Sequence, residues 1–347
     1  MIQTIHCNAA SGAYDITIGS GVWQKYTEFR GRKLLVRDGN VPDPGIEADG
    51  EVVLTPGEEH KTFAAVKSIC RAAARLHLTR KDCFIALGGG VTGDLTGFAS
   101  AIYMRGVPFI QIPTTLLAMV DASVGGKTAA DLPEGKNLIG AFHQPLGVLI
   151  DPDFLKTLSF TDLTCGLAEV VKTAVILDQE LFAALENAGE STVLAPDFEN
   201  LYPRLIKRCC QLKAQVVEQD EKESGLRAIL NYGHTFGHAV EQLSNFTIPH
   251  GSGVAIGMNV AGTLAAERGL WSREENLRQQ ELLKKLRMPV NIPAGFAPAE
   301  LLEVMRSDKK NDTSGIRLVL PQQIGHADTF SGIPEKEMLN ALELCHD

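Results

Sequence analysis

Residues 84–98 read FIALGGGVTGDLTGF, which is an apolar run, a glycine-rich turn and the beginning of a helical pattern. Gly88, Gly90 and Gly93 fit G-x-G-x-x-G directly after a strand and at the start of a helix, the context that the dinucleotide-binding motif requires. Glycines let the backbone approach a pyrophosphate, and the first helical turn presents free N–H groups to it. A tight strand-to-helix turn without a ligand would show the same pattern. The stretch therefore predicts an α/β fold and makes a nucleotide site a hypothesis.

The acidic residue that usually binds the ribose of the nucleotide is missing from its normal place. It should follow the glycines by about 20 positions, where residues 111–115 read QIPTT. Asp38, directly after the apolar run KLLVR, could serve instead, and so could Glu58. The sequence thus favours a nucleotide site whose layout differs from the standard Rossmann arrangement.

Short apolar runs alternate with helical stretches up to about residue 150. Strands are predicted over residues 33–37, 51–54, 83–87, 109–112 and 148–150, helices over 62–77, 91–104 and 114–124, and a hairpin or edge pair over 2–7 and 14–18. This alternation indicates a Rossmann-like, doubly wound parallel sheet.

After Asp151 the pattern changes to successive helices as far as Arg306. A short strand is predicted over residues 316–320 and a closing helix over 335–344. One of the helices carries Leu205, Cys209, Leu212 and Val216 on a single face, which is typical of ordinary core. We therefore predict an α/β domain over residues 1–151 and an all-helical domain over residues 152–347.

The composition limits the kind of protein. The 347 residues include 33 Lys and Arg against 42 Asp and Glu, and a formal charge of −9 argues against a general nucleic-acid or membrane-surface binder. Hydrophobic residues make up 44%, enough for a sizeable core. The seven cysteines form no C-x-x-C pair, the first residues lack an apolar signal segment, and no window is long and apolar enough for a membrane span. We expect reduced thiols and a cytoplasmic location.

Histidines and a carboxylate in the second half suggest metal chemistry. His234 and His238 are about one helical turn apart and share a face, and His250 begins the next predicted helix. Glu169 lies on an earlier helix, one turn before Lys172. Two histidines and a carboxylate, with open coordination positions, are the ligand set of a catalytic zinc. Spacing alone leaves open that these histidines are ordinary core or surface residues, and the absence of H-E-x-x-H disfavours a metalloprotease.

Several cations lie in glycine-rich or polar stretches. Lys127 occurs in SVGGKT and Lys136 in EGKN, beside small residues that would let a ligand approach. Most lysines in any protein are solvated surface residues, and that interpretation fits these two least well. A cation about 4 Å from an anion contributes about 4 kcal/mol at an effective dielectric of about 20. Local cations can therefore hold an anionic substrate despite the negative net charge.

Five stretches occur in a distinctive order along the chain. They read LGGGVTGDLTGFASAIYMRG (87–106), IPTTLLAMVDASVGGKTAADLPEGKNLIGAFHQP (112–145), GLAEVVKTA (166–174), LKAQVVEQDEKE (212–223) and LNYGHTFGHAVE (230–241). Together they closely resemble the 3-dehydroquinate synthases of the sugar phosphate cyclase family. Ala130 and Asp131 depart from the pattern, because many members carry a β-branched residue and Asn there. The resemblance implies an NAD-binding α/β domain, a helical domain that binds metal and substrate, and an active site in the cleft between them.

The resemblance also implies roles for individual residues. The zinc ligands would be Glu169, His234 and His250, with cobalt as an alternative metal. The catalytic residues would be His238, Lys172, Lys127 and Asn137, with His238 transferring protons beside the metal. NAD would contact Asp38, Glu58, Lys61, Gly88, Gly89, Gly90, Asp94, Thr114, Thr115, Asp121, Lys127 and Lys136. The substrate would contact Arg105, Asp121, Lys127, Lys136, Asn137, Lys172, Lys213, Arg227, Asn231 and one of Lys309 or Lys310.

The implied reaction explains why a nucleotide, a metal and cations are needed in one chain. 3-Deoxy-D-arabino-heptulosonate 7-phosphate is oxidised at C5 by NAD while zinc polarises its hydroxyls, and the new ketone acidifies the C6 hydrogen so that phosphate leaves by β-elimination. The hydride then returns, the ring opens, and an intramolecular aldol reaction gives 3-dehydroquinate, a step of the shikimate pathway to aromatic amino acids. NAD is not consumed. The family also suggests that the leaving phosphate acts as its own base.

Three other functions fit parts of the pattern. Another sugar phosphate cyclase would share most of it, although SVGGKT and GKNLIGAFHQP favour the dehydroquinate type. A metal-dependent NAD polyol dehydrogenase would not need so many cations for phosphate and carboxylate. A non-catalytic nucleotide-binding protein would not need Glu169, His234, His250 and Lys172 together. We expect a small sugar phosphate as substrate, no nucleic-acid or membrane partner, and a homodimer.

Overall fold

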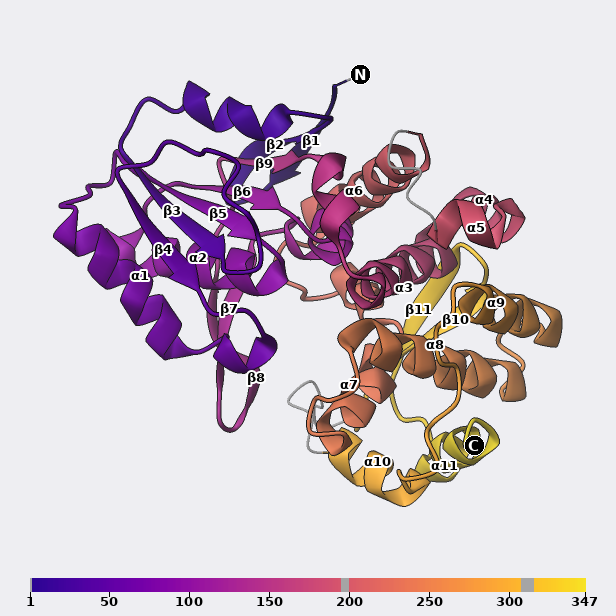
Figure 1. Cartoon of the computed structure of the whole chain (residues 1–347). Helices are drawn as coiled ribbons and strands as arrows, with labels where there is room; N and C mark the ends of the chain where they lie inside the picture. Colours follow the sequence, from indigo (N-terminus) through magenta and orange to yellow (C-terminus); the bar gives the residue numbers. More distant parts are fainter. Residues whose placement is uncertain (1, 195–199, 307–314) are drawn as a thin grey trace. The chain divides into compact units, whose positions relative to one another are not determined.

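The computed structural model describes residues 2–194, 200–306 and 315–347, and the chain forms two compact units (Figure 1). Unit 1 contains the chain up to Leu158 together with helix α6 (Leu201–Gln219) and the residues that follow it to Lys222. Unit 2 contains the chain from Ser159 to the end of α5 (Glu190–Leu194), and again from Glu223 onward. This division differs from the predicted single boundary after residue 151, because α6 packs within unit 1.

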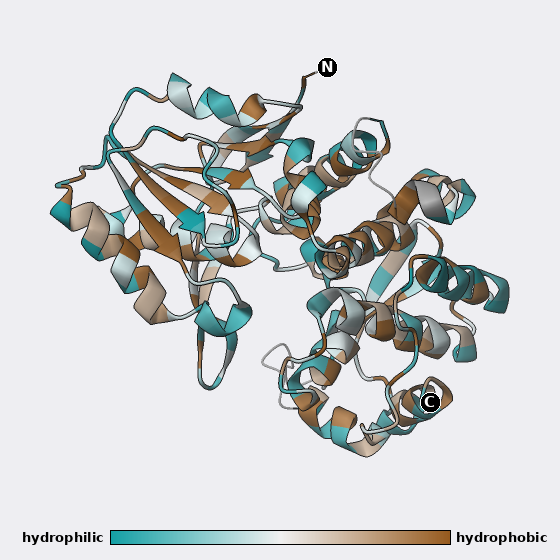
Figure 2. Cartoon of the chain, viewed as in Figure 1, coloured by the Kyte–Doolittle hydropathy of each residue, from teal (hydrophilic) through white to brown (hydrophobic). Residues whose placement is uncertain are grey.

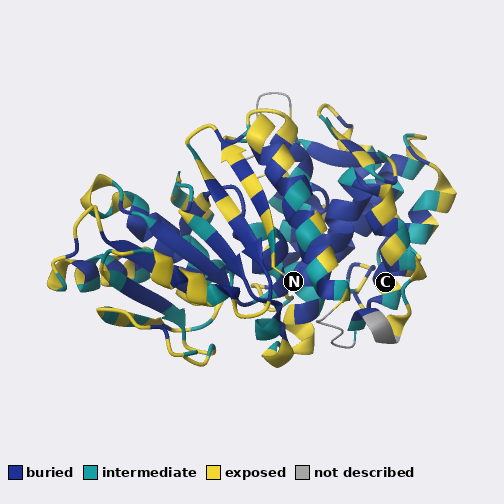
Figure 3. Cartoon of the chain, turned by 90° about the horizontal axis from the view of Figure 1, so that it is seen from above, coloured by how far each residue is buried: buried dark blue, intermediate teal, exposed yellow. Residues whose placement is uncertain are grey.

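Unit 1 is built on a seven-stranded sheet with the order β1-β2-β9-β6-β5-β3-β4. The strands are β1 (Gln3–Ala9), β2 (Gly12–Ile18), β3 (Lys33–Asp38), β4 (Gly50–Leu54), β5 (Cys83–Gly88), β6 (Phe109–Pro113) and β9 (Gly147–Ile150). All neighbours from β2 to β4 run parallel, and β1 is antiparallel to β2. Strands β5 and β6 are buried at every position, which is why they are almost entirely apolar, with Gln111 as the one polar residue (Figures 2 and 3). The predicted Rossmann-like sheet is confirmed.

Two apolar clusters cover the two faces of this sheet. On one face, Val66 of α1 (Phe63–Arg75) and Leu95 of α2 (Gly90–Ile102) pack with Leu34. On the other face, Tyr26 of the helical turn Val22–Glu28 packs with Leu35. Adjacent residues of β3 thus point to opposite sides, as a strand requires. This packing fixes the carboxyl end of β5, where α2 begins.

Helix α6 buries its predicted apolar stripe, because Leu205, Cys209, Leu212 and Val216 are all buried. The helix contacts the first part of the chain, and the Cys210 thiol donates to the Met119 carbonyl at 3.2 Å. The stripe correctly predicted a core helix. Its periodicity could not indicate which sheet or helix it would cover.

Two features of unit 1 differ from the sequence-based expectation. Residues 127–142 form an antiparallel ribbon of β7 (Lys127–Leu132) and β8 (Gly135–Phe142), which the sequence did not predict. The helix expected over residues 114–124 is present but shorter, over residues 116–122, and its second part, Ala118–Ala122, is π-helical. Both features lie near glycines and short polar residues, where hydrophobic periodicity is weak.

Unit 2 is mainly helical, as predicted. Its helices are α3 (Phe160–Leu177), α4 (Gln179–Asn187), α5, α7 (His234–Leu243), α8 (His250–Glu267), α9 (Arg273–Lys285), α10 (Pro298–Arg306) and α11 (Glu335–Leu344). One antiparallel ribbon, β10 (Leu318–Gln323) with β11 (His326–Phe330), accompanies them; the first of these strands corresponds to the one predicted over 316–320. Within the described ranges, every helix is too short or too polar to cross a lipid bilayer.

Candidate functional site

The glycine turn between β5 and α2 is closely packed around its backbone. A Cβ added at Gly88 would lie 2.6 Å from Thr92 Oγ1 and 2.9 Å from the Cβ of Asp38. The amide of Thr114 donates to the Gly88 carbonyl at 2.9 Å, which joins the ends of β5 and β6. Gly89 caps α2 without a side chain, so the first N–H groups of this 13-residue helix remain available to an anion.

Of the two acidic residues considered for the ribose, Asp38 lies beside this turn. Thr92 Oγ1 is 3.5 Å from Asp38 Oδ2, at the carboxyl end of the neighbouring strand β3. Thr115 also borders the turn, because its Cγ2 would lie 3.2 Å from a Cβ added at Gly89. Glu58 lies in a different cluster of charges. The carboxyl ends of parallel strands are where nucleotides bind in α/β folds, and this position favours Asp38.

That second cluster is centred on the buried Lys61, which is 5% exposed. Its Nζ lies 2.6 Å from Asp94 Oδ2 and donates to Asn137 Oδ1 at 2.6 Å, while Lys136 Nζ lies 3.6 Å from Glu58 Oε1. Burial alone would lower the pKa of Lys61, but Asp94 and Glu58 raise it above its usual value, so the ammonium group stays charged. Five residues predicted to contact NAD or substrate are therefore held in one ionic network.

Asp131, one of the two departures from the family pattern, is part of the frame of this network. Its amide donates to the Lys61 carbonyl at 2.7 Å, and its Oδ1 accepts from the Asn137 amide at 2.7 Å. Asn137 has φ +53°, a left-handed conformation that Asn tolerates better than most residues. The acidic side chain at this position thus supports the turn that presents Asn137.

Helix α6 brings Lys213 to Asp121. The Nζ of Lys213 lies 2.5 Å from Asp121 Oδ1 and donates to the Asp121 carbonyl at 2.6 Å. Lys127 begins β7 with an exposed side chain, and the preceding Gly125 amide donates to the Tyr14 hydroxyl at 3.0 Å. Arg105 is exposed after α2, with φ +66°. The structure therefore joins Lys213 with Asp121 and places Lys127 and Arg105 separately on the surface of unit 1.

In unit 2, Glu169, His234 and His250 meet through one carboxylate oxygen. Glu169 lies on α3 and is 1% exposed, and the two histidines are the first residues of α7 and α8. Glu169 Oε1 lies 3.6 Å from His234 Nε2 and 3.4 Å from His250 Nε2, and its other oxygen contacts Lys172 Nζ. Four ligands about 2.0–2.2 Å from a zinc ion are about 3.3–3.6 Å from one another in a tetrahedron. These three residues fit a divalent metal.

Close helix packing makes this convergence possible. A Cβ added at Gly257 would lie 1.9 Å from the Gly233 carbonyl oxygen, and one added at Gly237 would lie 2.7 Å from the Gly253 carbonyl oxygen. Gly233, with φ +77°, precedes α7 in a left-handed conformation. Glycines thus let α7 and α8 approach until their first residues, His234 and His250, face the same carboxylate.

The charges of this cluster are mutually dependent. Burial alone would raise the pKa of Glu169, but Lys172, His234 and His250 hold it well below its usual value. Burial alone would lower the pKa of His250, but Glu169 and Glu241 raise it to about 10. Glu169 is therefore ionised, as a metal ligand would have to be, and a metal ion would have to replace the proton on His250.

Three further predicted residues lie in unit 2. The ring of His238 is 5.3 Å from that of His234 and 6.0 Å from that of His250, beside the cluster of Glu169, His234 and His250. Arg227 is 1% exposed, and Asn231 donates to the Ala228 carbonyl at 3.2 Å. Lys309 and Lys310 lie outside the described residues.

Sequence reasoning missed Glu241 and Tyr232 as neighbours of the histidines. His250 Nδ1 lies 2.8 Å from Glu241 Oε1, and His234 Nδ1 lies 3.0 Å from the Tyr232 carbonyl oxygen. Glu241 follows His238 by three residues and so lies on the same side of α7, a signal that could have identified it.

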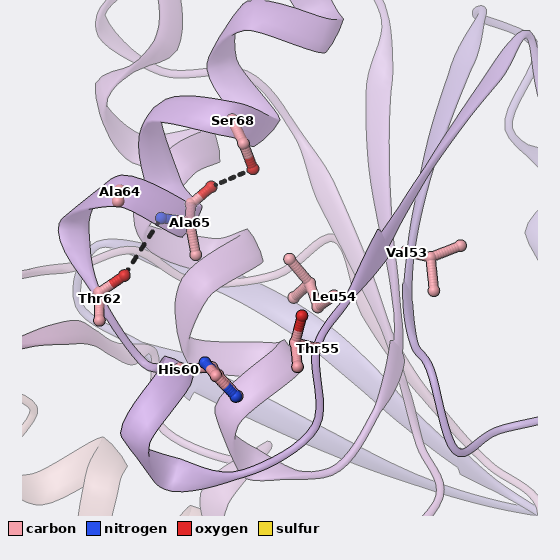
Figure 4. A pocket seen from close by; sticks show the side chains of 8 residues that line it. All are labelled: Val53, Leu54, Thr55, His60, Thr62, Ala64, Ala65 and Ser68. Carbon is pink, nitrogen blue, oxygen red and sulfur yellow. Dashed lines mark hydrogen bonds between the residues drawn. The ribbon is translucent and has the colours of Figure 1, made fainter.

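A shallow hollow beside α1 is a separate feature (Figure 4). Its lining residues are Val53, Leu54, Thr55, His60, Thr62, Ala64, Ala65 and Ser68. Thr62 Oγ1 accepts from the Ala65 amide at 3.4 Å, and Ser68 Oγ donates to the Ala65 carbonyl at 2.7 Å. Both hydrogen bonds are local to α1, and no predicted site residue lines the hollow. We therefore assign the hollow no role.

Family models for two parts of one enzyme match consecutive segments of the chain. The model of the 3-dehydroquinate synthase N-terminal region matches residues 51–165, and that of the C-terminal region matches residues 166–311. The chain belongs to the 3-dehydroquinate synthase family. Named 3-dehydroquinate synthases of a Synechococcus strain and a Picosynechococcus strain are 44% and 45% identical to this member, with 95% and 94% of both chains covered.

Solved structures of other sugar phosphate cyclases have the same fold as this family member. A 2-epi-5-epi-valiolone synthase from Streptomyces hygroscopicus, with NAD⁺ and Zn²⁺ bound, is 28% identical over 96% of both chains, with a TM-score of 0.87. A 2-deoxy-scyllo-inosose synthase complexed with carbaglucose-6-phosphate, NAD⁺ and Co²⁺ is 24% identical, covers 99% of this chain and all of its own, and also has a TM-score of 0.87. A probable glycerol dehydrogenase from Sinorhizobium meliloti, 12% identical over 95% of both chains with a TM-score of 0.67, shows the fold alone.

Proposed function

We propose that this chain is a 3-dehydroquinate synthase that converts 3-deoxy-D-arabino-heptulosonate 7-phosphate to 3-dehydroquinate and phosphate, with NAD restored at the end of each turnover. The observation that carries the proposal is the convergence of His234 and His250 on one carboxylate oxygen of Glu169, in a chain that also has a glycine turn at the end of β5 with no side-chain cap on the helix that follows. Relatives of that name at 44–45% identity over nearly the whole chain support it.

The residues present fit both implied cofactors. NAD would be held by the glycine turn Gly88–Gly90, where a side chain would fill the space against Thr92, with Asp38 for a ribose. Zinc or cobalt would be held by Glu169, His234 and His250. When bound, NAD supplies a reversible hydride acceptor and the metal a Lewis acid for the substrate hydroxyls.

In unit 2 the chain's own residues hold charge and move protons. Lys172, 1% exposed, keeps Glu169 ionised as a ligand and offers N–H donors to substrate oxygens. We assign proton transfer to His238, because its ring lies 5.3 Å from His234 without belonging to the triad with Glu169. Arg227 and Asn231 supply donors to carboxylate and hydroxyl groups of the substrate.

In unit 1 the cations bind anionic groups and the ionic network orients them. Lys213 is held by Asp121 and Lys61 by Asp94, so that their ammonium groups have defined positions before a ligand arrives. Preorganised donors of this kind stabilise developing charge without reorganising during the reaction. Lys127, Lys136, Asn137 and Arg105 would then contact the phosphate and carboxylate of the substrate.

We also propose that the enzyme is a cytoplasmic homodimer. The structure describes all seven cysteines and joins no pair of them by a disulfide, which suits a reducing compartment. Sedimentation-equilibrium measurements on the purified chain give its mass directly, and a species near 37.5 kDa would exclude the dimer.

One assay separates the proposed function from its rivals. The purified protein with NAD and zinc should release phosphate and form 3-dehydroquinate from the heptulosonate phosphate, without net accumulation of NADH. Stoichiometric NADH without phosphate would instead show a polyol dehydrogenase. A different carbocycle from another sugar phosphate would show another cyclase. The variant His250→Ala should lose activity and bound metal together, and metal content equal to wild type would refute the ligand assignment.

A further inference from the structure

Each histidine of the Glu169 triad has its second ring nitrogen occupied by an oxygen atom. His234 Nδ1 faces the neutral carbonyl of Tyr232 at 3.0 Å, whereas His250 Nδ1 faces the Glu241 carboxylate at 2.8 Å. Both Nε2 atoms are thereby left to face Glu169. The two imidazoles are oriented by different chemistry, and only His250 is oriented by a charged group.

Glu241 is built into this position. Its side chain is 2% exposed, and Gly253 of α8 leaves room for it, because a Cβ there would lie 2.9 Å from Glu241 Cγ and 3.1 Å from Oε1. Burying a carboxylate is costly unless it is paired or hydrogen-bonded. The 2.8 Å contact with His250 provides such a partner.

The proton in this contact has a defined place. An ionised carboxylate can only accept hydrogen bonds, so His250 Nδ1 must be the donor. A neutral imidazole that carries its proton on Nδ1 has its lone pair on Nε2, the atom that faces Glu169. Carboxylates that orient metal-binding histidines in this way also raise their basicity as ligands.

We propose that Glu241 is a positioning residue of the metal site, which fixes His250 in the tautomer that presents Nε2 to the metal. The proposal rests on the assignment of Glu169, His234 and His250 as metal ligands. It goes beyond that assignment because it makes the affinity for metal depend on a residue that is not itself a ligand. The Tyr232 carbonyl orients His234 in the same way but more weakly, because it carries no charge.

A different role for Glu241 must be distinguished from this one. His238, Glu241 and His250 also have ligand atoms within 4.8 Å of one another, so Glu241 could itself bind a second metal ion. That arrangement would need His250 Nδ1 as a ligand, which the hydrogen bond to Glu241 excludes. One metal ion per chain is therefore expected.

The experiment measures zinc affinity by competition with a chromogenic chelator, for wild type and for Glu241→Gln. The amide keeps the volume but removes the charge, and the dissociation constant for zinc should rise about tenfold or more. The matched control is Glu221→Gln, which removes a carboxylate that is also buried, 7% exposed, but lies in unit 1. The control should keep the wild-type affinity.

The proposal would be overturned if Glu241→Gln bound zinc within twofold of the wild-type affinity. It would also be overturned if the wild type bound two zinc ions per chain and the variant only one. Melting temperatures of the metal-free proteins show whether the variant is folded. If it is not, ¹⁵N NMR of the zinc-loaded wild type decides. Zinc on Nε2 and a proton on Nδ1 of His250 support the proposal, and zinc on Nδ1 refutes it. Normal turnover by wild type in either case would leave the proposed function standing.

Discussion

The substitution Gly257→Ala tests whether close packing of α7 and α8 assembles the metal cluster. The new methyl group would lie 1.9 Å from the Gly233 carbonyl oxygen and 2.7 Å from the Gly237 amide nitrogen, where ordinary contact begins at 3.4 Å. The obstacle is backbone, so it cannot rotate away as a flexible side chain could. The helices must separate locally by an ångström or more.

Such a displacement affects stability and metal binding differently. Overpacking of a closely packed interior costs about 1–3 kcal/mol and occasionally more, and we expect about 3 kcal/mol here because the clash is with backbone. Metal–ligand distances tolerate only about 0.2 Å. A shift of His234 relative to His250 should therefore weaken zinc binding about 100-fold.

The assays are urea unfolding of the metal-free protein and zinc competition. The control is Gly295→Ala in the same unit, because an added Cβ there meets nothing within 4 Å. It should change the free energy of unfolding by less than about 0.5 kcal/mol and leave zinc affinity unaltered. If Gly257→Ala bound zinc as tightly as wild type, the reasoning that glycine contacts bring the two histidines together would be refuted.

Three further perturbations address the other parts of the chain. Gly88→Ala places a methyl group 2.6 Å from Thr92 Oγ1. Calorimetry should therefore show NAD binding weakened at least tenfold and zinc binding unchanged. Unaltered NAD affinity would contradict the assignment of this turn to the nucleotide. Lys172→Met leaves the Glu169 carboxylate buried without its ammonium partner, which should lower the free energy of unfolding of the metal-free protein by about 3–5 kcal/mol. Zinc should then raise the melting temperature of the variant by more than that of wild type. If the free energy of unfolding fell by less than about 1 kcal/mol, the result would argue against the buried pair. Burial raises the pKa of Glu221, but hydrogen bonds from Ser11 and Gln144 hold it below its usual value, so its contribution is present above about pH 4.5 and is lost as pH falls. Urea unfolding should accordingly show Glu221→Gln about 1–3 kcal/mol less stable than wild type at pH 7, with the difference shrinking as the pH falls below about 4.5, and a difference independent of pH would exclude this role.

The parallel sheet could be predicted because its central strands are buried on both faces. Phe84–Leu87 is an uninterrupted apolar run, Phe109–Ile112 is interrupted only by the buried Gln111, and a glycine turn marks where a helix starts. The β7–β8 ribbon could not be predicted in this way. Its residues mix small, charged and apolar side chains without a regular alternation, and its hydrogen bonds depend on pairing between strands rather than on an apolar face.

The candidate site shows the same distinction between local pattern and tertiary packing. Spacing put His234 and His238 on one helical face, but the residue that completes the triad is His250, brought in by contact between α7 and α8. The resemblance to the family, and not the spacing, predicted that set. Glu241 was missed because a glutamate on an amphipathic helix usually belongs to the solvated face, and its burial depends on the space left by Gly253.

The membership of α6 in unit 1 has a consequence for how the chain is made. The Asn8 amide in β1 donates to Glu218 Oε1 at 2.7 Å, across a separation of 210 residues. At synthesis rates of about 5–20 residues per second, the first strand waits about 10–40 s for this partner. Until then the side of the hairpin that α6 will cover stays open on the ribosome, while the intervening residues of unit 2 are already emerging. Unit 1 therefore cannot complete its packing when residue 158 has been made, and must wait until residue 222, after the first segment of unit 2 has already been synthesised.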